Sequence, residues 1–208
     1  MHKKLSLSVA LLLFLSSAPW CISLTQAKPP HGIILISFDT LRADSLGIYG
    51  YHRNTSPFID AFAQESIVFE NAIAQAPWTL PSHMSIMTSL YPISHGVVET
   101  NLRLADEQVT LAELLRAGGY QTAAFTSGGP MSEVYGFDQG FDTYDHKWIT
   151  IEQLLPKVKK WLETNKENPF FLFIHSFDIH YPYNPPLLLT LSFMIFPILV
   201  GVFQAAKP

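Results

Sequence analysis

The sequence predicts an α/β fold in which a mostly parallel sheet is covered by helices on both faces. Short, largely apolar runs are typical of strands buried on both sides, and here they alternate with amphipathic stretches of helical length. The length of 208 residues favours one domain. Hydrophobic residues make up 48% and charged residues 14%, a balance that argues against intrinsic disorder.

The first half of the chain contains two predicted strands around a helix. Residues 33–36 (IILI) form an apolar run that leads to Asp39 at its carboxyl end. A serine followed by a proline then opens a helix over residues 56–66, because proline fits the first helical turn. Residues 67–69 (IVF) predict a second strand.

The second half repeats this alternation. Thr110 and Glu113 have the spacing of a capping box and open a helix that ends at a pair of glycines. A strand over residues 120–126, a helix over 150–162 and a strand over 169–174 follow. Ligands of such sheets bind at the carboxyl ends of the strands, so functional residues are expected there.

Both ends of the chain are apolar. Residues 1–27 have the three-part layout of a secretory signal, which predicts export to the periplasm or the extracellular space, with an uncleaved anchor as the alternative. Residues 187–206 carry no charge and just reach the length of a membrane span. A foreign tail and a buried core segment are the alternatives there. The predicted division is a signal peptide at 1–27, a partial domain at 28–186 and a hydrophobic tail at 187–208.

Composition also excludes several kinds of chemistry. Cys21 is the only cysteine and lies within the predicted signal, so the exported chain has no disulfide, cysteine nucleophile or thiolate metal ligand. The formal net charge is −4, which argues against a nucleic acid partner. Membrane association through residues 187–206 remains an open alternative.

Residues 79–90 predict a helix that begins at Thr79-Leu-Pro. A hydroxyl at a helix start lies near unpaired backbone N–H groups and the positive end of the helix dipole, where a sulfate or phosphate is stabilised. With a metal ion bound to its oxygen, this threonine can act as a nucleophile. From these residues alone, a capping role for Thr79 or Ser82 is the alternative.

Two further groups of polar residues follow predicted strands. Asp39 is placed to bind a hard cation such as Ca²⁺, Mg²⁺ or Mn²⁺, with a role in a turn as the alternative. Arg42 is expected to pair with a nearby acid or with an anionic substrate. Asp178 and His180 follow the last strand and are expected to share a crevice with Asp39. A histidine there can bind a substrate oxygen or protonate a leaving group, with a structural role as the alternative. The spacing of twelve residues between His83 and His95 does not by itself indicate a zinc site.

Taken together, these segments resemble the N-terminal part of the sulfatase family, within the alkaline phosphatase superfamily. Three stretches carry the resemblance: residues 36–50 (ISFDTLRADSLGIYG), 79–96 (TLPSHMSIMTSLYPISHG) and 173–183 (FIHSFDIHYPY). Residues 110–120 and 136–144 match less strongly. The order and spacing of these stretches extend the resemblance over residues 31–186.

The resemblance implies a metal-assisted ester hydrolase in which the residue at position 79 attacks sulfur or phosphorus. The site residues that it implies are catalytic Thr79, His83 and His180, substrate-binding Arg42 and Asp178, and metal-binding Asp39, Thr40 and Thr79. The implied cofactor is a divalent cation, Ca²⁺ in the first place, with Mg²⁺, Mn²⁺ or Zn²⁺ as alternatives. The implied substrate is an anionic ester of a small molecule, a glycan or a lipid.

The sequence departs from the family pattern in two ways. Family members with sulfatase activity carry Cys or Ser in a Cys/Ser-x-Pro-Ser-Arg motif and convert it to formylglycine, whereas this chain has Thr79 and His83. The branch that keeps an unmodified threonine includes phosphoethanolamine and phosphoglycerol transferases. The family also completes its metal site from its C-terminal half, and this chain has no Asp, Glu, Asn or His after Pro186.

Three functions are therefore expected in order. The first is a sulfatase-like hydrolase of sulfate esters. The second is a phosphoester hydrolase or a phosphoethanolamine or phosphoglycerol transferase that uses Thr79. The third is a truncated, membrane-tethered remnant with weak or no turnover.

Overall fold

The computed structural model describes residues 30–182, and their centre is a four-stranded sheet. The strands are β1 (Gly32–Phe38), β2 (Gln121–Ser127), β3 (Thr143–Lys147) and β4 (Phe170–Ser176). Their spatial order is β1-β4-β2-β3, and every pair is parallel. The predicted fold class is confirmed, because parallel strands in this order require crossover connections over the faces of the sheet.

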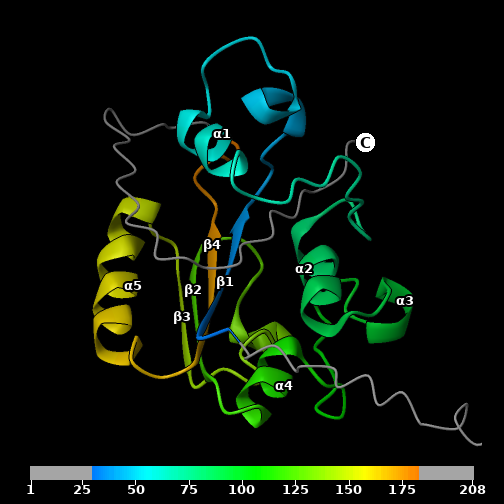
Figure 1. The fold of residues 1–208 in the computed structure, drawn as a ribbon. Helices are drawn as coiled ribbons and strands as arrows, with labels where there is room; N and C mark the ends of the chain where they lie inside the picture. Colours follow the sequence, from blue (N-terminus) through cyan, green and yellow to red (C-terminus); the bar gives the residue numbers. More distant parts are fainter. Residues whose placement is uncertain (1–29, 183–208) are drawn as a thin grey trace, which may run out of the picture.

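Helices cover both faces of this sheet (Figure 1). One face carries α5 (Ile151–Asn165), and the other carries α2 (Thr79–Thr88), α3 (Pro92–His95) and α4 (Leu111–Ala117). The remaining helix, α1 (Pro57–Ala63), lies beyond the carboxyl ends of the strands. Three short 3-10 turns complete the helical elements: η1 (Ala43–Ser45), η2 (Gly47–Tyr49) and η3 (Glu133–Tyr135).

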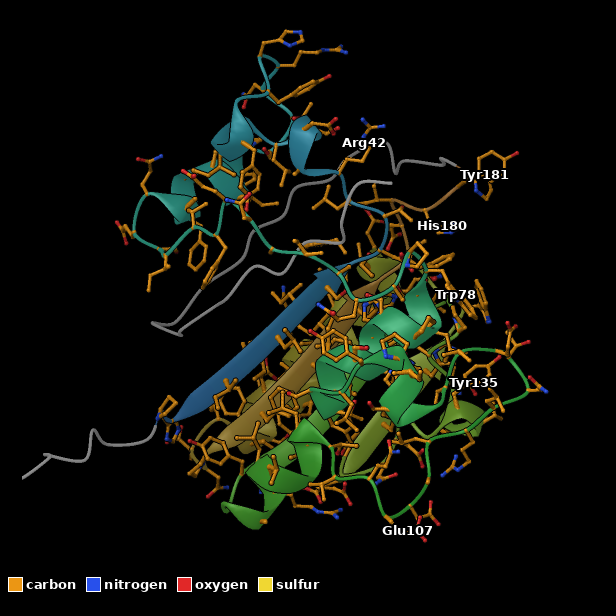
Figure 2. All side chains as sticks on the ribbon, turned by 90° about the vertical axis from the view of Figure 1, so that its right-hand side faces the viewer. Arg42, Trp78, Glu107, Tyr135, His180 and Tyr181 are labelled. Atoms are coloured by element: carbon orange, nitrogen blue, oxygen red, sulfur yellow. The ribbon has the colours of Figure 1, made fainter. Side chains whose placement is uncertain are left out.

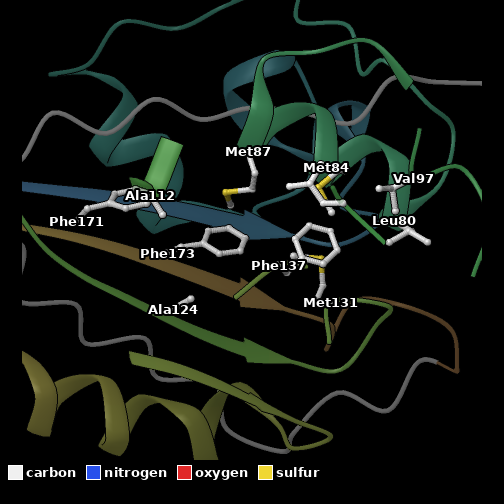
Figure 3. Close-up of a cluster of buried hydrophobic side chains, with 11 residues drawn as sticks. Leu80, Met84, Met87, Val97, Ala112, Ala124, Met131, Phe137, Phe171 and Phe173 are labelled. Atoms are coloured by element: carbon white, nitrogen blue, oxygen red, sulfur yellow. The ribbon is translucent and has the colours of Figure 1, made fainter. Parts of the chain in front are cut away.

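The core consists of two apolar clusters, one on each face, because side chains alternate along a strand. In β4, Phe171 and Phe173 pack on the side of α2 and α4, whereas Leu172 and Ile174 pack on the side of α5. Figure 3 shows the first cluster, in which Phe171 and Phe173 of β4 face Met84 and Met87 of α2. The site described below lies where this cluster reaches the carboxyl edge of the sheet.

The predicted elements differ from the structure in three places. Residues 67–69 form no strand, and Ile67 is 75% exposed, because none of the described strands lies beside this segment to pair with it. The strand β3 (TYDHK) was not predicted, because its polar sequence carries no local strand signal. Its pairing with β2 keeps this segment extended. Helix α3 is only four residues long and was also not predicted.

The capping box at the start of α4 is formed as the sequence predicts. The Thr110 hydroxyl accepts a hydrogen bond from the Glu113 N–H at 3.1 Å, and the Glu113 carboxylate accepts one from the Thr110 N–H at 2.9 Å. We expect Thr110→Ala to lower the free energy of unfolding by about 0.5–2 kcal/mol, because it leaves a helical N–H unpaired. Urea denaturation of the full chain measures this loss, and a variant as stable as the natural protein would contradict it.

The expectations for the two ends of the chain fall on residues 1–27 and 187–208, which lie outside the described residues. Among the helices of residues 30–182, none combines the length and the apolar character that crossing a bilayer requires.

Candidate active site

The site is centred on a contact between the end of β1 and the start of α2. The Thr79 hydroxyl donates a hydrogen bond of 2.8 Å to Oδ2 of Asp39, which is only 8% exposed. Trp78 is the N-cap of α2, and no side chain caps the helix there. The Thr79 hydroxyl therefore does not cap the helix. Thr79 and Asp39, which the sequence analysis identified as candidate nucleophile and candidate metal ligand, are in direct contact.

A second layer of polar side chains lies beneath this contact. The Ser37 hydroxyl lies 2.7 Å from Nε2 of His83 and 3.3 Å from Nδ1 of His175. The other ring nitrogen of His83, Nδ1, is 2.9 Å from the Thr79 carbonyl oxygen. His175 is fully buried and His83 nearly so. Thr79 is thus held from its carbonyl as well as from its hydroxyl.

The hydrogen bonds fix where the protons of this layer lie. A carbonyl only accepts, so Nδ1 of His83 carries the proton and donates to Thr79. Nε2 of His83 must then accept from the Ser37 hydroxyl, and the oxygen of Ser37 accepts from Nδ1–H of His175. This order leaves Nε2 of His175 with an unshared electron pair.

Burial keeps these imidazoles neutral. It lowers the pKa of His83, against the opposing effects of the Thr79 carbonyl and Asp39. It lowers the pKa of His175 well below the ordinary value, and the imidazoles of His83 and His146 add to that shift. At neutral pH each ring therefore has one nitrogen that carries a proton and one that can accept a hydrogen bond.

Arg42 and His180 lie beyond the carboxyl ends of β1 and β4 (Figure 2), outside this contact. Arg42 forms two hydrogen bonds with the Asp44 carboxylate, of 2.9 and 2.6 Å, at an exposed position. Thr40 has a positive φ of 58° and donates to the Ile179 carbonyl oxygen at 3.3 Å. That bond ties the turn after β1 to the turn after β4.

Asp178 and His180 are placed by the turn after β4. The Asp178 carboxylate accepts from the Ile151 N–H at 3.0 Å and from the Ser176 hydroxyl at 2.7 Å, so it anchors the start of α5. The His180 ring stacks on Phe177 with centroids 4.1 Å apart. Its Nδ1 donates to the Tyr181 carbonyl oxygen at 2.6 Å, which leaves Nε2 as the ring nitrogen that can exchange a proton with a ligand.

Comparison with known proteins identifies the family. A model of the sulfatase family matches residues 31–190, which is most of the chain. The chain belongs to the sulfatase family. It is 36% identical over 91 residues to the ulvan-active sulfatase of Formosa agariphila, an alignment that covers 44% of this chain and 18% of that protein.

Two solved structures share the fold. One is a complex with its substrate D-glucosamine-2-N,6-O-disulfate, with a TM-score of 0.65, 24% identity and coverage of 74% of this chain and 35% of that one. The other is the phosphonate monoester hydrolase of Agrobacterium radiobacter, with a TM-score of 0.57, 18% identity and coverage of 75% and 42%. The chain spans 17–33% of the length of eight curated relatives that it matches.

Sulfatases generally use a divalent metal ion, so we tested whether the described residues fit one. Within residues 30–182 no group of three or more His, Cys, Asp or Glu side chains is arranged to hold a metal ion. Asp39 and Thr79 supply two neighbouring oxygens, far fewer than the six to eight that Ca²⁺ takes. These residues do not fit a complete Ca²⁺ site.

Ser37 and His175 belong to this site but were not among the predicted site residues. Strand alternation could have found them. Phe171, Phe173 and His175 are two residues apart on one face of β4, and Ser37 is the register partner of His175 on β1. What the sequence could not supply is the register itself, which sets Ser37 opposite His175.

The buried histidines also predict how stability depends on pH. His95 accepts from the Val97 N–H through Nδ1, and burial lowers its pKa, as it does for His83 and His175. The unfolded chain therefore binds more protons as the pH falls through about 6.5, and stability is lost in that direction.

We expect the melting temperature to fall between pH 7.5 and 5.5, and to fall less in His95→Asn, which cannot be protonated. Thermal unfolding followed by circular dichroism at each pH checks this. A His95→Asn variant with the same decline as the natural chain would show that His95 contributes nothing to it.

Proposed function

We propose that this protein is an exported sulfatase that hydrolyses sulfate esters of anionic glycans, with Thr79 as the nucleophile. The observation that carries the proposal is the 2.8 Å hydrogen bond from the Thr79 hydroxyl to Asp39 at the ligand-binding edge of the sheet. A nucleophilic hydroxyl needs a neighbouring group that orients it and accepts its proton. Asp39 is in position for both tasks.

The reaction proceeds by two displacements at sulfur. In the first, Oγ1 of Thr79 forms a bond to sulfur while the bond from sulfur to the ester oxygen breaks, and the Thr79 proton passes to Asp39. The leaving alcohol takes a proton from Nε2 of His180. In the second, the oxygen of water forms a bond to sulfur while the bond from sulfur to Oγ1 of Thr79 breaks. Asp39 returns its proton to Oγ1, Nε2 of His180 takes a proton from the water, and sulfate leaves with the remaining proton released to solvent. A divalent cation bound at this edge would supply charge neutralisation for the sulfate oxygens.

The hydroxyl is held in place by the layer beneath it. His83 donates to the Thr79 carbonyl oxygen, and Ser37 holds His83 from the other side. We assign His83 the role of positioning the nucleophile, because its ring contacts the backbone of Thr79 through these bonds. Proximity and orientation of this kind are worth several kcal/mol of the reaction barrier.

The glycan part of the proposal rests on the relatives. The matched relatives include an ulvan-active sulfatase and an N-acetylglucosamine-6-O-sulfatase of Bacteroides thetaiotaomicron. The solved complex with the same fold carries a glucosamine disulfate. Export is supported by the signal-like layout of residues 1–27.

A second candidate is hydrolysis of phosphate or phosphonate esters by the same residues. It is favoured by Thr79 itself, because the sulfatases that the sequence resembles use a modified Cys or Ser at this position. The phosphonate monoester hydrolase with the same fold adds to it.

A panel of esters tests both candidates. The full chain is incubated, with each divalent cation in turn, with 4-nitrophenyl sulfate, 4-nitrophenyl phosphate, bis(4-nitrophenyl) phosphate and glucosamine 6-sulfate. We expect the two sulfates to be hydrolysed with the higher kcat/KM. A preference for the phosphates would replace the first candidate by the second, and no turnover of any ester would overturn both.

A further inference from the structure

We propose that Trp148 is a glycan-binding residue, whose indole ring stacks on a sugar unit next to the one that carries the sulfate ester. The inference deepens the proposed function and rests on it for the class of ligand, a sulfated oligosaccharide. It starts from an exposed aromatic side chain for which the mechanism above has no role.

The first observation is that Trp148 is exposed and yet supported by two neighbouring loops. It directly follows β3 and is 74% exposed. Its ring packs edge-to-face against Phe177 of the turn after β4, with centroids 5.6 Å apart and an interplanar angle of 82°. It also lies against the backbone of Gly128 after β2, where a Cβ atom would come within 3.0 Å of the indole. The ring is therefore held in place while most of its surface faces solvent.

The second observation is that Trp148 ends a row of aromatic rings that begins at the proposed catalytic acid. Phe177, which supports the indole, stacks on His180 with centroids 4.1 Å apart and an interplanar angle of 16°. In the proposed mechanism, Nε2 of His180 gives its proton to the leaving alcohol. A substrate whose ester lies at His180 can thus extend along this row as far as Trp148.

The geometry of the sheet determines which part of the substrate can reach the indole. The order β1-β4-β2-β3 places β3 three positions away from β1, which leads to Asp39. At about 4.8 Å per strand, the ends of β1 and β3 are about 14 Å apart. This separation is greater than the width of one pyranose ring. The sugar that stacks on Trp148 is therefore a neighbour of the sulfated unit, and the ligand is an oligosaccharide.

The chemistry of the indole favours a sugar as its ligand. One face of a pyranose ring carries mainly C–H groups and is apolar, whereas the rim carries hydroxyl groups. An indole offers the matching surface, a flat apolar face with an N–H group at its edge. Because contacts with Phe177 and Gly128 already hold the ring, little side-chain freedom is lost on binding. The preceding residue, Lys147, is exposed and adds a positive charge that favours an anionic glycan.

Calorimetry with oligosaccharides tests this inference. The full chain is titrated with sulfated tetrasaccharides prepared from ulvan, heparin and chondroitin 6-sulfate, and separately with glucosamine 6-sulfate. We expect at least one tetrasaccharide to bind, and Trp148→Ala to weaken that binding at least about tenfold, which is about 1.4 kcal/mol. The loss for glucosamine 6-sulfate should be smaller, because one sugar unit does not reach from the ester site to Trp148.

Two further variants separate stacking from a general loss of apolar surface. Trp148→Phe keeps an aromatic face and should bind the tetrasaccharide within about threefold of the natural chain. Tyr91→Ala removes a ring that is 67% exposed at the N-cap of α3, and tetrasaccharide binding should be unchanged. Thermal unfolding establishes that each variant is folded.

Three results would each overturn the inference. They are the failure of every tetrasaccharide to bind, a folded Trp148→Ala chain that binds them as tightly as the natural chain, and equal losses for the tetrasaccharide and for glucosamine 6-sulfate. Sedimentation velocity tests an interface between two copies. If the natural chain dimerised and Trp148→Ala did not, the indole would belong to that interface instead. Tetrasaccharide binding that depends on Trp148, without hydrolysis of any ester, would sink only the proposed function.

Discussion

Thr79→Ala is expected to lower kcat/KM for the preferred ester by at least about 10³-fold. The substitution removes the only hydroxyl that donates to Asp39 within the described residues, and with it the atom that attacks sulfur. Because Thr79 is the first residue of α2 and its side chain does not cap the helix, the loss of stability should be small. Steady-state kinetics with the ester panel, together with a melting curve, measures both effects.

Two variants of the same helix serve as controls. Thr79→Ser keeps the hydroxyl and should keep most of the activity. Thr88→Ala removes a threonine that donates to the Met84 carbonyl oxygen at the far end of α2, and activity should be unchanged. If Thr79→Ala were as active as the natural chain, the nucleophile would have to be another residue, and the proposed mechanism would fail.

Phe171→Ala is expected to lower the free energy of unfolding by about 3–5 kcal/mol. Phe171 is 0% exposed, lies in the middle of the sheet on β4 and stacks on Phe141 with ring centroids 5.7 Å apart. The substitution leaves a cavity between the sheet and the α2 and α4 layer. A loss of this size is a large share of the stability of an ordinary domain.

Chemical denaturation of the full chain measures this loss against a matched substitution. Phe69→Ala changes a phenylalanine that is 52% exposed, so its effect should stay within about 0.5 kcal/mol. Equal losses for the two variants would mean that the face of the sheet covered by α2 and α4 is not the core of the folded protein. Activity is not needed for this test, so it stands apart from the functional proposal.

Local signals along the chain were enough to predict most of the fold. The apolar run before Asp39 forms β1, the capping box at Thr110 opens α4, and the run before His175 forms β4. Each of these elements is specified by its own residues, through burial on both faces or through a hydrogen bond three residues away. The segment 67–69 has the composition of a strand but does not form one. A strand is stable only beside another, and none of the described strands lies beside this segment.

The sequence by itself determined the fold class, the family resemblance and the identity of Thr79 and Asp39 as candidates, since each of these depends on residues that are close along the chain. Only the tertiary structure decided which distant polar groups meet. Ser37 and His175 are 138 positions apart, and the pairing of β1 with β4 brings them together at one register position. Contacts of this kind follow from strand order and register, which are set by packing of the whole sheet and leave no signal in any single segment.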